Sequence, residues 1–449
     1  MQSQPDTTKW WHGLTRYEWF VMSVAGCAWL FDNLDQRLFS LARIPALASL
    51  MHMPGPSLEV QAFGKIVTAA FLIGWGVGGM TLGAIGDRFG RARTLTFCIL
   101  VYSVCTGLSA FSRNEIDFAI LRFVTGIGIG GVFGLAVSLI VDSVPANARL
   151  AMLGILQLLA IVGNVSAALI KMGVDVLDPT PASSWRWLFF IGTLPALLAV
   201  ASGFFLKEPE PWRKLKREGN LPKTSLGAYA DLLATPERRR NVLIGSLLAC
   251  TGVVGLWAIG EYAVDLQDAV FTAHFKDLGV SGKPLSAAVA QAKNLAYVLQ
   301  MLGGAVGTVI FTWICSRYGR RPAFLAGFSS ALILTAFTYY SMSSPTDAYW
   351  MMPLMGAAQF SVFAGFSIYL PELFGSRVRS TGVSFAYNLG RFAAAGGSFF
   401  SALLTTQVFG AFASPLPLRY AAITMSGVFV VGIVTALLAP ETKGQPLPE

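Results

Sequence analysis

Apolar segments of about 20 residues recur along the chain and limit its fold more than any other feature of the sequence. Each is long enough to cross a bilayer core of roughly 30 Å as an α-helix. With 54% hydrophobic and only 13% charged residues, the 449-residue chain is too apolar for an ordinary soluble globule. We place twelve such segments, at about residues 17–42, 61–85, 92–111, 117–142, 149–172, 186–206, 241–265, 290–315, 322–343, 347–371, 380–406 and 418–439. The sequence therefore predicts an all-α integral membrane protein with twelve transmembrane helices.

The short turn from Gly83 to Leu95 sets the orientation of these segments. It reads G-A-I-G-D-R-F-G-R-A-R-T-L and joins the second segment to the third. Because charges inside the hydrocarbon are costly, this turn must emerge into water, and its excess of arginine marks that side as cytoplasmic. A second basic turn, Thr312 to Pro322, and the segment 207–240, which holds nine of the 33 lysines and arginines, follow the same rule. An even number of spans then places both termini in the cytoplasm.

The two halves of the chain repeat one another. Asp142-Ser-Val-Pro-Ala-Asn-Ala-Arg149 follows the fourth segment, and Glu372-Leu-Phe-Gly-Ser-Arg-Val-Arg379 follows the tenth, so acid and arginine both recur after 230 residues. Tandem repeats of six spans are a known transporter architecture. The repeat predicts two bundles of six helices.

A further landmark supports this division. Arg186 at the start of the sixth segment corresponds to Arg419 at the start of the twelfth. We therefore expect an N-terminal six-helix bundle over 1–206, a cytoplasmic linker over 207–240 with a surface helix near 225–234, and a C-terminal bundle over 241–449.

Several classes of function are disfavoured. The net charge of +9 is carried by short loops between spans, which fits orientation and attraction to anionic lipid better than nucleic-acid binding. Gly126-x-Gly128-x-x-Gly131 lies inside an apolar segment with no preceding strand, so helix packing explains it better than a dinucleotide site. The five cysteines and three histidines lack metal-ligand spacing, and no nucleotide-binding P-loop occurs. We expect no metal, no cofactor and no enzymatic activity.

The motifs together resemble those of the major facilitator superfamily over essentially the whole chain. Gly83-x-x-x-Asp87-Arg88-x-Gly90-Arg91-x-Arg93 is similar to the family's loop between its second and third helices, and Arg122-x-x-x-Gly126-x-Gly128 to its helix 4 motif. Pro371-Glu372-Leu373-Phe374, Arg379-Ser-Thr-Gly382 and Pro440-Glu441-Thr442-Lys443-Gly444 resemble the sugar and organic-acid branches. The resemblance implies a monomeric secondary transporter with two pseudo-symmetric six-helix bundles, a central site at their interface and alternating access.

Two acids of the first segment are the main candidates for proton exchange. Asp32 and Asp35 lie three residues apart in W-L-F-D-N-L-D-Q-R, on neighbouring parts of one helix face, and Asp32 lies about 22 Å along the helix from Tyr17. Carboxylates at such depth are functional by default. The alternative is that one of them pairs with Arg37 or caps a helix break.

This segment also resembles the D-G-F-D type motif in helix 1 of the aromatic-acid, lactate and sialate proton symporters, with Asn33 and Leu34 in place of the usual glycine and aromatic residue. The resemblance implies that Arg122 assists proton exchange. A purely structural bond from Arg122 to the first helix or to backbone carbonyls is an equal alternative.

Basic residues near the core favour an anionic substrate. Arg37, Arg122 and Arg391 lie within or beside the apolar segments, and arginine suits bidentate carboxylate binding. For Arg391 the alternative is an ion pair with Glu261. Polar or aromatic residues that could line a substrate cavity, a minority of which we expect to touch substrate, are Gln157, Asn164, Trp257, Tyr262, Asn294, Gln300, Gln359, Tyr387 and Asn388.

The cytoplasmic turns predict a gate. Asp87 is expected to accept backbone N–H groups at the start of a helix of the other half, Arg91 to pair with Asp142, and Glu372 to pair with Arg320 or Arg379. The second turn departs from the family pattern, with Ser316 in place of the acid and Thr312 in place of the first glycine. The residues assigned to gating are Gly83, Asp87, Arg88, Gly90, Arg91, Asp142, Arg149, Arg320, Glu372 and Arg379.

The sequence thus predicts a proton-coupled symporter of a small organic anion: a monocarboxylate, an aromatic acid or an acidic sugar. Three alternatives stay open, namely a sugar or polyol carrier, a proton-antiport efflux pump and a non-transporting sensor. Because the loops are short and the first 15 residues contain no cleavable signal, we expect a bacterial inner membrane. The expected partners are the substrate, protons and the lipid bilayer.

Overall fold

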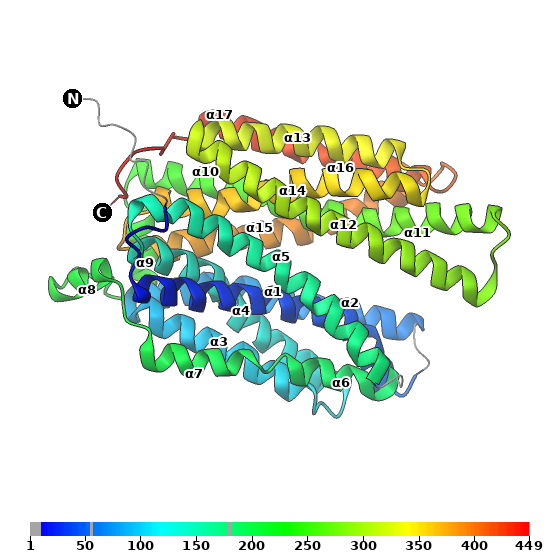
Figure 1. The fold of residues 1–449 in the computed structure, drawn as a ribbon, viewed down its shortest axis with the longest axis horizontal. Helices are drawn as coiled ribbons and strands as arrows, with labels where there is room; N and C mark the ends of the chain where they lie inside the picture. Colours follow the sequence, from blue (N-terminus) through cyan, green and yellow to red (C-terminus); the bar gives the residue numbers. More distant parts are fainter. Residues whose placement is uncertain (1–9, 54–56, 178–180, 449) are drawn as a thin grey trace. The chain divides into compact units, whose positions relative to one another are not determined.

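The computed structural model describes residues 10–53, 57–177 and 181–448, and the regular secondary structure of this part of the chain is helical, with no strand (Figure 1). In chain order the helices are α1 (Arg16–Leu50), α2 (Leu58–Phe89), α3 (Arg91–Ser109), α4 (Glu115–Ser143), α5 (Ala146–Leu177), α6 (Pro181–Ile191), α7 (Pro195–Phe205), α8 (Glu210–Arg217), α9 (Ser225–Leu232), α10 (Pro236–Val253), η1 (Val254–Ala258), α11 (Ile259–Asp277), α12 (Gly282–Arg317), α13 (Arg320–Ser341), α14 (Pro345–Leu373), α15 (Arg379–Leu403), η2 (Leu404–Val408), α16 (Leu416–Ser426) and α17 (Val428–Leu438). Within the described residues, ten helical stretches are long and apolar enough to span a membrane. The predicted all-α membrane fold is confirmed.

Each predicted apolar segment corresponds to a helix or to a run of helices. The sixth segment is divided into α6 and α7, the seventh contains the π-helical turn η1, and α15 continues into the π-helical turn η2. Several helices extend beyond the predicted segments; α1, for example, continues to Leu50 and α12 begins at Gly282. The apolar-segment rule detects only the part of a helix that faces hydrocarbon, whereas backbone hydrogen bonding continues into water. The predicted linker helix appears as α9.

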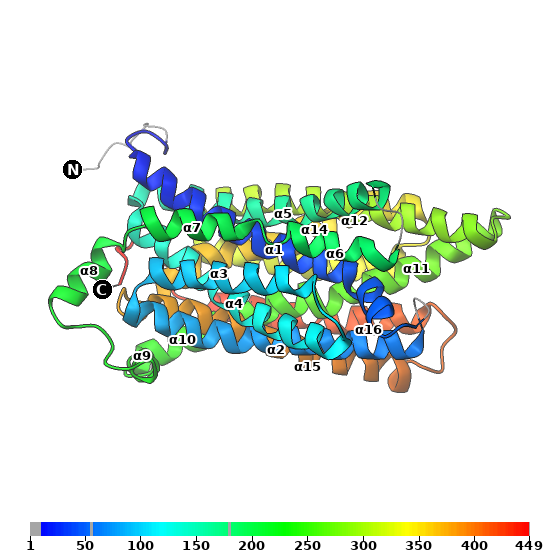
Figure 2. The same cartoon turned by 90° about the horizontal axis from the view of Figure 1, so that it is seen from below.

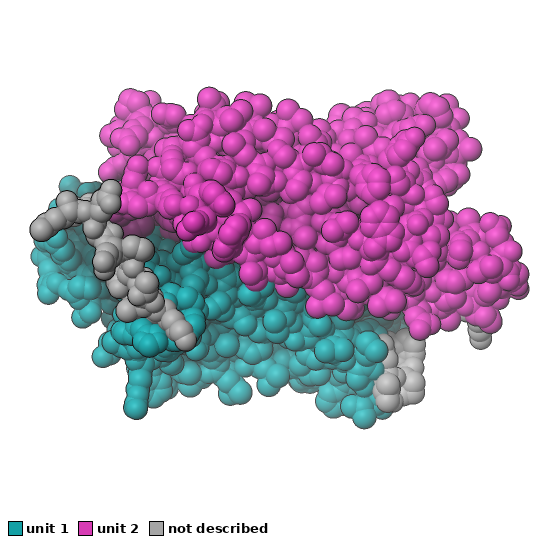
Figure 3. Space-filling model, turned by 45° about the horizontal axis from the view of Figure 1, so that its top comes forward, with its two compact units in different colours: residues 1–231, 375–381, 449 teal, residues 232–374, 382–448 magenta. Residues whose placement is uncertain are grey.

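The described chain divides into two compact units, which Figure 3 colours separately. Unit 1 comprises residues 1–231 and 375–381 together with residue 449, and unit 2 comprises 232–374 and 382–448. Unit 1 therefore includes both linker helices, α8 and α9, and the first turn of α15.

In unit 1, α2 and α4 pack through glycines (Figure 2). A Cβ atom at Gly78 would collide with the backbone of Ile127, and one at Gly126 with the backbone of Phe71. The absence of side chains allows the two backbones to approach closely, which is how small residues associate helices in a membrane. The interpretation of the glycine motif in α4 as helix packing is confirmed.

Charged side chains that flank the sixth span hold both ends of α3. Glu208 accepts hydrogen bonds from the N–H groups of Ala92 and Arg93 at 3.2 and 3.1 Å, at the positive end of α3. Arg186 donates to the carbonyls of Ala110 and Ser112 at the other end. Each charge therefore has the sign that the helix dipole favours.

Unit 2 repeats this arrangement around α13. Glu441 accepts from the N–H groups of Arg320 and Arg321 at 2.9 and 3.0 Å, and Arg419 donates to the carbonyls of Tyr339, Tyr340 and Met342. Burial acts to raise the pKa of Glu441, but these N–H groups, the N–H of Lys443 and the charge on Arg320 outweigh it and lower the pKa. Glu208 and Glu441 are 233 residues apart, the same spacing as Arg186 and Arg419. The repeat seen in the sequence is therefore a repeat of helix caps.

The contact between α2 and α4 predicts the effect of a single methyl group. Gly78→Ala should destabilise the protein by about 1–3 kcal/mol, because the added Cβ meets backbone atoms that cannot rotate away. Gly173→Ala is the matched control, since a Cβ at Gly173 meets nothing within 4 Å. Thermal unfolding in detergent measures both variants. Equal melting temperatures would show that α2 and α4 do not need this approach.

Candidate functional site

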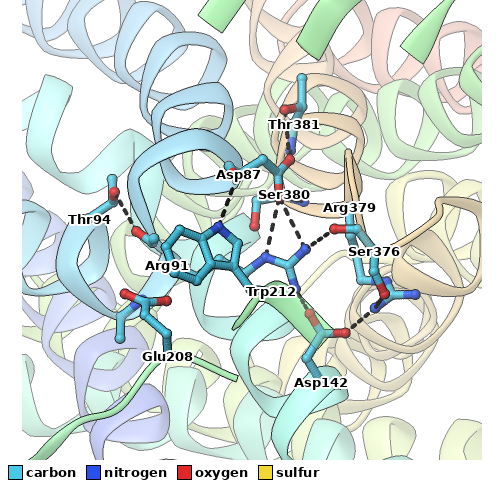
Figure 4. Close-up of polar contacts among 12 residues, drawn as sticks. Asp87, Arg91, Thr94, Asp142, Glu208, Trp212, Ser376, Arg379, Ser380 and Thr381 are labelled. Atoms are coloured by element: carbon cyan, nitrogen blue, oxygen red, sulfur yellow. Dashed lines mark hydrogen bonds and ion pairs between the residues drawn. The ribbon is translucent and has the colours of Figure 1, made fainter. Parts of the chain in front are cut away.

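Four charged residues form a buried cluster in unit 1: Asp87, Arg91, Asp142 and Arg379, hereafter the charge cluster (Figure 4). Their side chains are at most 1% exposed. Arg91 pairs with Asp87 at 3.1 Å and also with Asp142, which in turn pairs with Arg379. The charges alternate in sign along the chain of contacts and sum to zero, which offsets the cost of burial.

Asp87 binds the first turn of α15. Its Oδ2 accepts the N–H and hydroxyl of Thr381 at 2.7 and 2.8 Å, and its Oδ1 accepts the N–H of Ser380 at 3.2 Å (Figure 4). The positive end of a helix favours a carboxylate at this position. The predicted contact of Asp87 with a helix N-terminus of the second half is present, as is the predicted pair of Arg91 with Asp142.

Linker residues reinforce the turn between α2 and α3. The Trp212 indole N–H donates to the carbonyl of Asp87 at 2.9 Å, and Glu208 caps α3 beside Gly90. Gly90 has a φ of +119°, and a Cβ there would collide with the carboxylate of Glu208. Only glycine fits both the conformation and the space. Tyr229 of α9 donates to the carbonyl of Met80, and burial raises its pKa to about 12.

The corresponding turn of unit 2 is built differently. Arg320 binds Glu372 through two hydrogen bonds of 2.9 and 2.5 Å, and Thr442 donates to the same carboxylate. Ser316, at the position of Asp87, donates to the carbonyl of Trp313 within its own helix at 2.7 Å. Of the two partners predicted for Glu372, Arg320 is therefore correct, whereas Arg379 belongs to the charge cluster.

The other residues assigned to gating lie at the edge of this region. Gly83 is buried in α2, and the Arg88 guanidinium lies 4.8 Å from the centre of the adjacent Phe89 ring rather than in the charge cluster. Arg149 donates to the carbonyl of Val144 at 2.9 Å, beyond the end of α4.

A second buried ion pair joins α1 to α4. Asp35 and Arg122 are at most 1% exposed, with 3.5 Å between Oδ2 of Asp35 and Nη1 of Arg122. Thr106 of α3 donates to Asp35 at 2.7 Å and accepts from Arg122 at 3.2 Å. Arg122 also donates to the Ser109 hydroxyl at 2.8 Å. The predicted bond from Arg122 to the first helix is present, and Thr106 connects the two charges.

Aromatic rings surround the guanidinium of Arg122. Its centre lies 4.8 Å from the ring centre of Phe189, 5.9 Å from that of Phe39 and 6.0 Å from that of Phe118. These rings come from α6, α1 and α4 and exclude water. Cation–π attraction helps to retain the charge there.

Four other candidates of unit 1 lie on α1 and α5. Asp32 is fully buried, and Arg37 is half-buried. Gln157 accepts the indole N–H of Trp29 at 3.3 Å, and Asn164 donates to Asn33 at 3.5 Å. These two candidates therefore connect helices, in the way that polar residues often do in membranes.

In unit 2, one turn of α15 brings three candidates together. Arg391 is 6% exposed; its Nε donates to Asn388 at 3.3 Å, and its guanidinium lies 5.2 Å from the centre of the Tyr387 ring. Stacking of this kind fixes the orientation of the planar guanidinium.

The remaining candidates of unit 2 lie elsewhere. Gln359 donates to Thr335 of α13 at 3.1 Å, and Gln300 packs against Gly356 of α14, so both lie at contacts between helices. Tyr262 donates to the carbonyl of Ser401 at 2.8 Å. Trp257, in the π-helical turn η1, is 38% exposed, and Asn294 is exposed on α12. Glu261, the predicted alternative partner of Arg391, lies outside the residues whose side chains the structure describes.

The sequence analysis missed several members of these sites. Thr106, Ser109, Trp212 and Glu208 are common polar or aromatic residues in helices or linkers, and none stands in a motif that we recognised. The 233-residue spacing from Glu208 to Glu441 was available in the sequence and could have identified the capping acids.

Comparisons with known proteins agree with this architecture. The family model of the Major Facilitator Superfamily matches residues 38–398, so the chain belongs to this superfamily of membrane transporters. The cis,cis-muconate transport protein of Acinetobacter baylyi is 26% identical over 93% of this chain and 94% of its own length. The 4-hydroxybenzoate transporter PcaK of the same organism is 25% identical over 87% of this chain and 86% of its own. The fold is similar to that of the proton:xylose symporter XylE, with a TM-score of 0.75 at 19% identity over 96% of this chain and 98% of that one.

The family resemblance seen in the motifs is thus confirmed, and with it the conclusion that the chain is a multi-pass membrane transporter and not an enzyme.

A double-mutant cycle tests the charge cluster. Asp142→Asn and Arg379→Gln should each destabilise the protein, with a coupling energy of about 1–3 kcal/mol, because each single change leaves a buried charge uncompensated. The matched control is the pair of Glu210 and Arg213, which are 58% and 54% exposed at 2.7 Å and should couple by less than about 1 kcal/mol. Denaturant unfolding in refolding-competent detergent supplies the free energies. Equal coupling in both pairs would contradict a cluster stabilised by buried charge.

Proposed function

We propose that this transporter carries a small organic anion together with a proton, by alternating access. The observation that carries the proposal is the buried pair of Asp35 and Arg122, joined through Thr106. In this proposal Asp35 is the main proton-exchanging residue, and the charge of Arg122 controls how readily Asp35 binds a proton. Asp32 contributes a second carboxylate from the same helix.

The geometry of the pair supports a switch between two charge states. Asp35 lies 3.5 Å from Arg122 and accepts its one short hydrogen bond from a neutral hydroxyl, Thr106. A proton bound to Asp35 cancels the attraction to Arg122, while the rings of Phe39, Phe118 and Phe189 continue to hold the guanidinium. Protonation can therefore change the packing of α1 against α4, and the bond of Asp35 with Thr106, without expelling the arginine.

Arg391 is the best candidate for binding the anion. Its guanidinium is nearly buried and oriented by Asn388 and Tyr387, and arginine binds carboxylates through two parallel hydrogen bonds. The names of the relatives point the same way, because muconate and 4-hydroxybenzoate are both carboxylates. We infer a substrate with at least one carboxylate: a linear organic acid, an aromatic acid or an acidic sugar.

We further propose that the charge cluster and the pair of Arg320 with Glu372 act as the cytoplasmic gate. Asp87 bonds the first turn of α15 directly, so movement of this turn away from α2 must break three hydrogen bonds to Thr381 and Ser380. The strength of such contacts sets the populations of the open and closed states.

The same proposal covers the surroundings of the protein. The basic turns support a cytoplasmic position for both termini, and the similarity to bacterial transporters supports a bacterial inner membrane. A monomer is expected, with the bilayer, the substrate and protons as its partners.

Uptake into proteoliposomes with an inward proton gradient tests the coupling. The wild type should accumulate an anion from a panel of radiolabelled muconate, 4-hydroxybenzoate, lactate, sialate and glucose. Asp35→Asn should lose accumulation at least tenfold while it retains exchange of labelled for unlabelled substrate, because exchange needs no net proton movement. Asp268→Asn is the control, since Asp268 is 62% exposed and pairs with Lys293. Glucose entry that ignores the gradient in wild type and Asp35→Asn alike would instead identify a sugar carrier.

Substitution of Arg391 tests recognition of the anion. Arg391→Lys should raise KM about tenfold, because lysine keeps the charge but lacks the planar fork that Tyr387 and Asn388 orient. Arg391→Gln should raise KM roughly a hundredfold. The exposed Arg213→Gln serves as the control for loss of a positive charge. A KM unchanged in both Arg391 variants, measured as initial uptake against substrate concentration, would remove Arg391 from the site.

A further inference from the structure

Tyr102 of α3 lies at the centre of unit 1 and has no role in the pair of Asp35 with Arg122. It is one of the largest fully buried side chains, with 0% of its surface exposed. Its hydroxyl forms no hydrogen bond with any residue that the structure describes. Burying a hydroxyl without a hydrogen-bond partner costs free energy, so the position of Tyr102 calls for an explanation.

The register of α1 and α3 brings Tyr102 to the two acids. Thr106 bonds Asp35, Tyr102 precedes Thr106 by one helical turn, and Asp32 precedes Asp35 by nearly one turn. Both carboxylates act electrostatically on the Tyr102 hydroxyl, and Asp32 acts more strongly than Asp35. Extended by one turn from the contact of Thr106 with Asp35, this register predicts that Tyr102 faces Asp32.

The packing behind Tyr102 fixes its position. Gly128 of α4 lies so close that a Cβ there would come within 2.8 Å of the Tyr102 nitrogen and 3.0 Å of its Cβ. Because α4 leaves no space on that side, the backbone and Cβ of Tyr102 are fixed against α4.

We propose that Tyr102 is a positioning residue for proton exchange, and that its hydroxyl donates a hydrogen bond to the Asp32 carboxylate once that carboxylate has released its proton. When Asp32 is protonated, its own O–H donates to the phenol oxygen instead. The only bond that forms or breaks is the O–H bond of Asp32, whose proton is exchanged with water, and the phenol keeps its own proton in both states. The inference deepens the proposed function, since it rests on proton exchange at the α1 acids.

Few other charged groups face this position. The titratable side chains that act on the Tyr102 hydroxyl come from α1 and from α3 itself; they are Asp32, Asp35, Cys98 and Cys27. From α4, Arg122 reaches Asp35 through Thr106. Among the other helices that pack against α3, α7 carries no ionisable residue, Arg186 of α6 binds the carbonyls beyond α3, and the charges of α2 lie near its ends.

The test is a pH titration of the purified full-length protein in lipid nanodiscs, followed by the infrared absorbance of protonated carboxyl groups. The signal that Asp32→Asn removes is assigned to Asp32. Tyr102→Phe removes only the hydroxyl. The bond to the ionised carboxylate is charge-assisted and therefore stronger than the bond to the protonated form, so its loss leaves Asp32 protonated to higher pH. The midpoint of the Asp32 signal should rise by about one pH unit, a tenfold change in proton affinity. Ser103→Ala is the matched control, because Ser103 is equally buried on α3 but bonds its own helix at Ile99.

Two results would overturn the inference. One is an Asp32 midpoint that is identical in wild type and Tyr102→Phe. The other is a Tyr102→Phe effect on the remaining carboxyl signals that is as large in the Asp32→Asn background as in its absence, since the coupling would then not involve Asp32. If Tyr102→Phe does not fold, wild type grown with ring-labelled tyrosine replaces it. A tyrosine band should then shift with the Asp32 midpoint and stay constant in Asp32→Asn.

Because this readout needs no transport, it separates the two proposals. A Tyr102-dependent midpoint in a protein that shows no gradient-driven uptake would support the role of Tyr102 and reject proton-coupled symport. Gradient-driven uptake with a midpoint that ignores Tyr102 would do the reverse.

Discussion

The high cost of an uncompensated charge in a low-dielectric interior is the constraint on which this structure depends. Every buried arginine described above has an acid, a carbonyl or an aromatic ring against it, and the spacing of these contacts determines how the helices pack. The charge cluster joins α2, α3 and α4 to the first turn of α15, while Asp35 and Arg122 join α1 to α4 and both bond Thr106 of α3. The apolar segments make the chain a membrane protein, but the contacts of the buried charges determine which helices pack together.

The same physics explains why the two halves are alike at some positions and different at others. The third helix of each half has an acid at its positive end and an arginine at its negative end, because every helix has a dipole whatever its role. The basic turns are less alike. Asp87 bonds a helix terminus, whereas Ser316 bonds its own helix, and the arginine that follows binds Glu372 instead. Both halves therefore contain the helix caps, whereas the bond from this turn to the first turn of α15 is made by Asp87 of the first half.

Much of this was accessible from the sequence, and the exceptions have a common cause. The twelve apolar segments, the contacts of Asp87 and Arg91, and the glycine packing of α2 against α4 follow from local rules of hydropathy, charge and size. The partners of Arg122 do not, because Thr106 and Ser109 are ordinary small polar residues whose importance arises only when α3 packs against α4. Trp212 was missed for the same reason, since a tryptophan in a basic linker gives no sign that it will be buried. Contacts between distant residues depend on how the helices are rotated, and apolar periodicity does not determine that rotation.

A comparison of the two buried acidic sites supports the proposal that Asp35, and not Asp87, exchanges protons. Asp87 accepts five hydrogen bonds, from Arg91 twice, from the N–H groups of Ser380 and Thr381, and from the Thr381 hydroxyl. A proton on Asp87 would compete with all of them and leave the charge cluster with a net positive charge. Asp35 accepts one short bond from a neutral hydroxyl and faces an arginine at 3.5 Å, so a proton there displaces much less. Since Arg122 has the rings of three phenylalanines to hold it, the loss of its anionic partner is also less costly than it would be for Arg91. In this proposal, a buried carboxylate beside an arginine stays ionised where hydrogen-bond donors saturate it and exchanges protons where they do not.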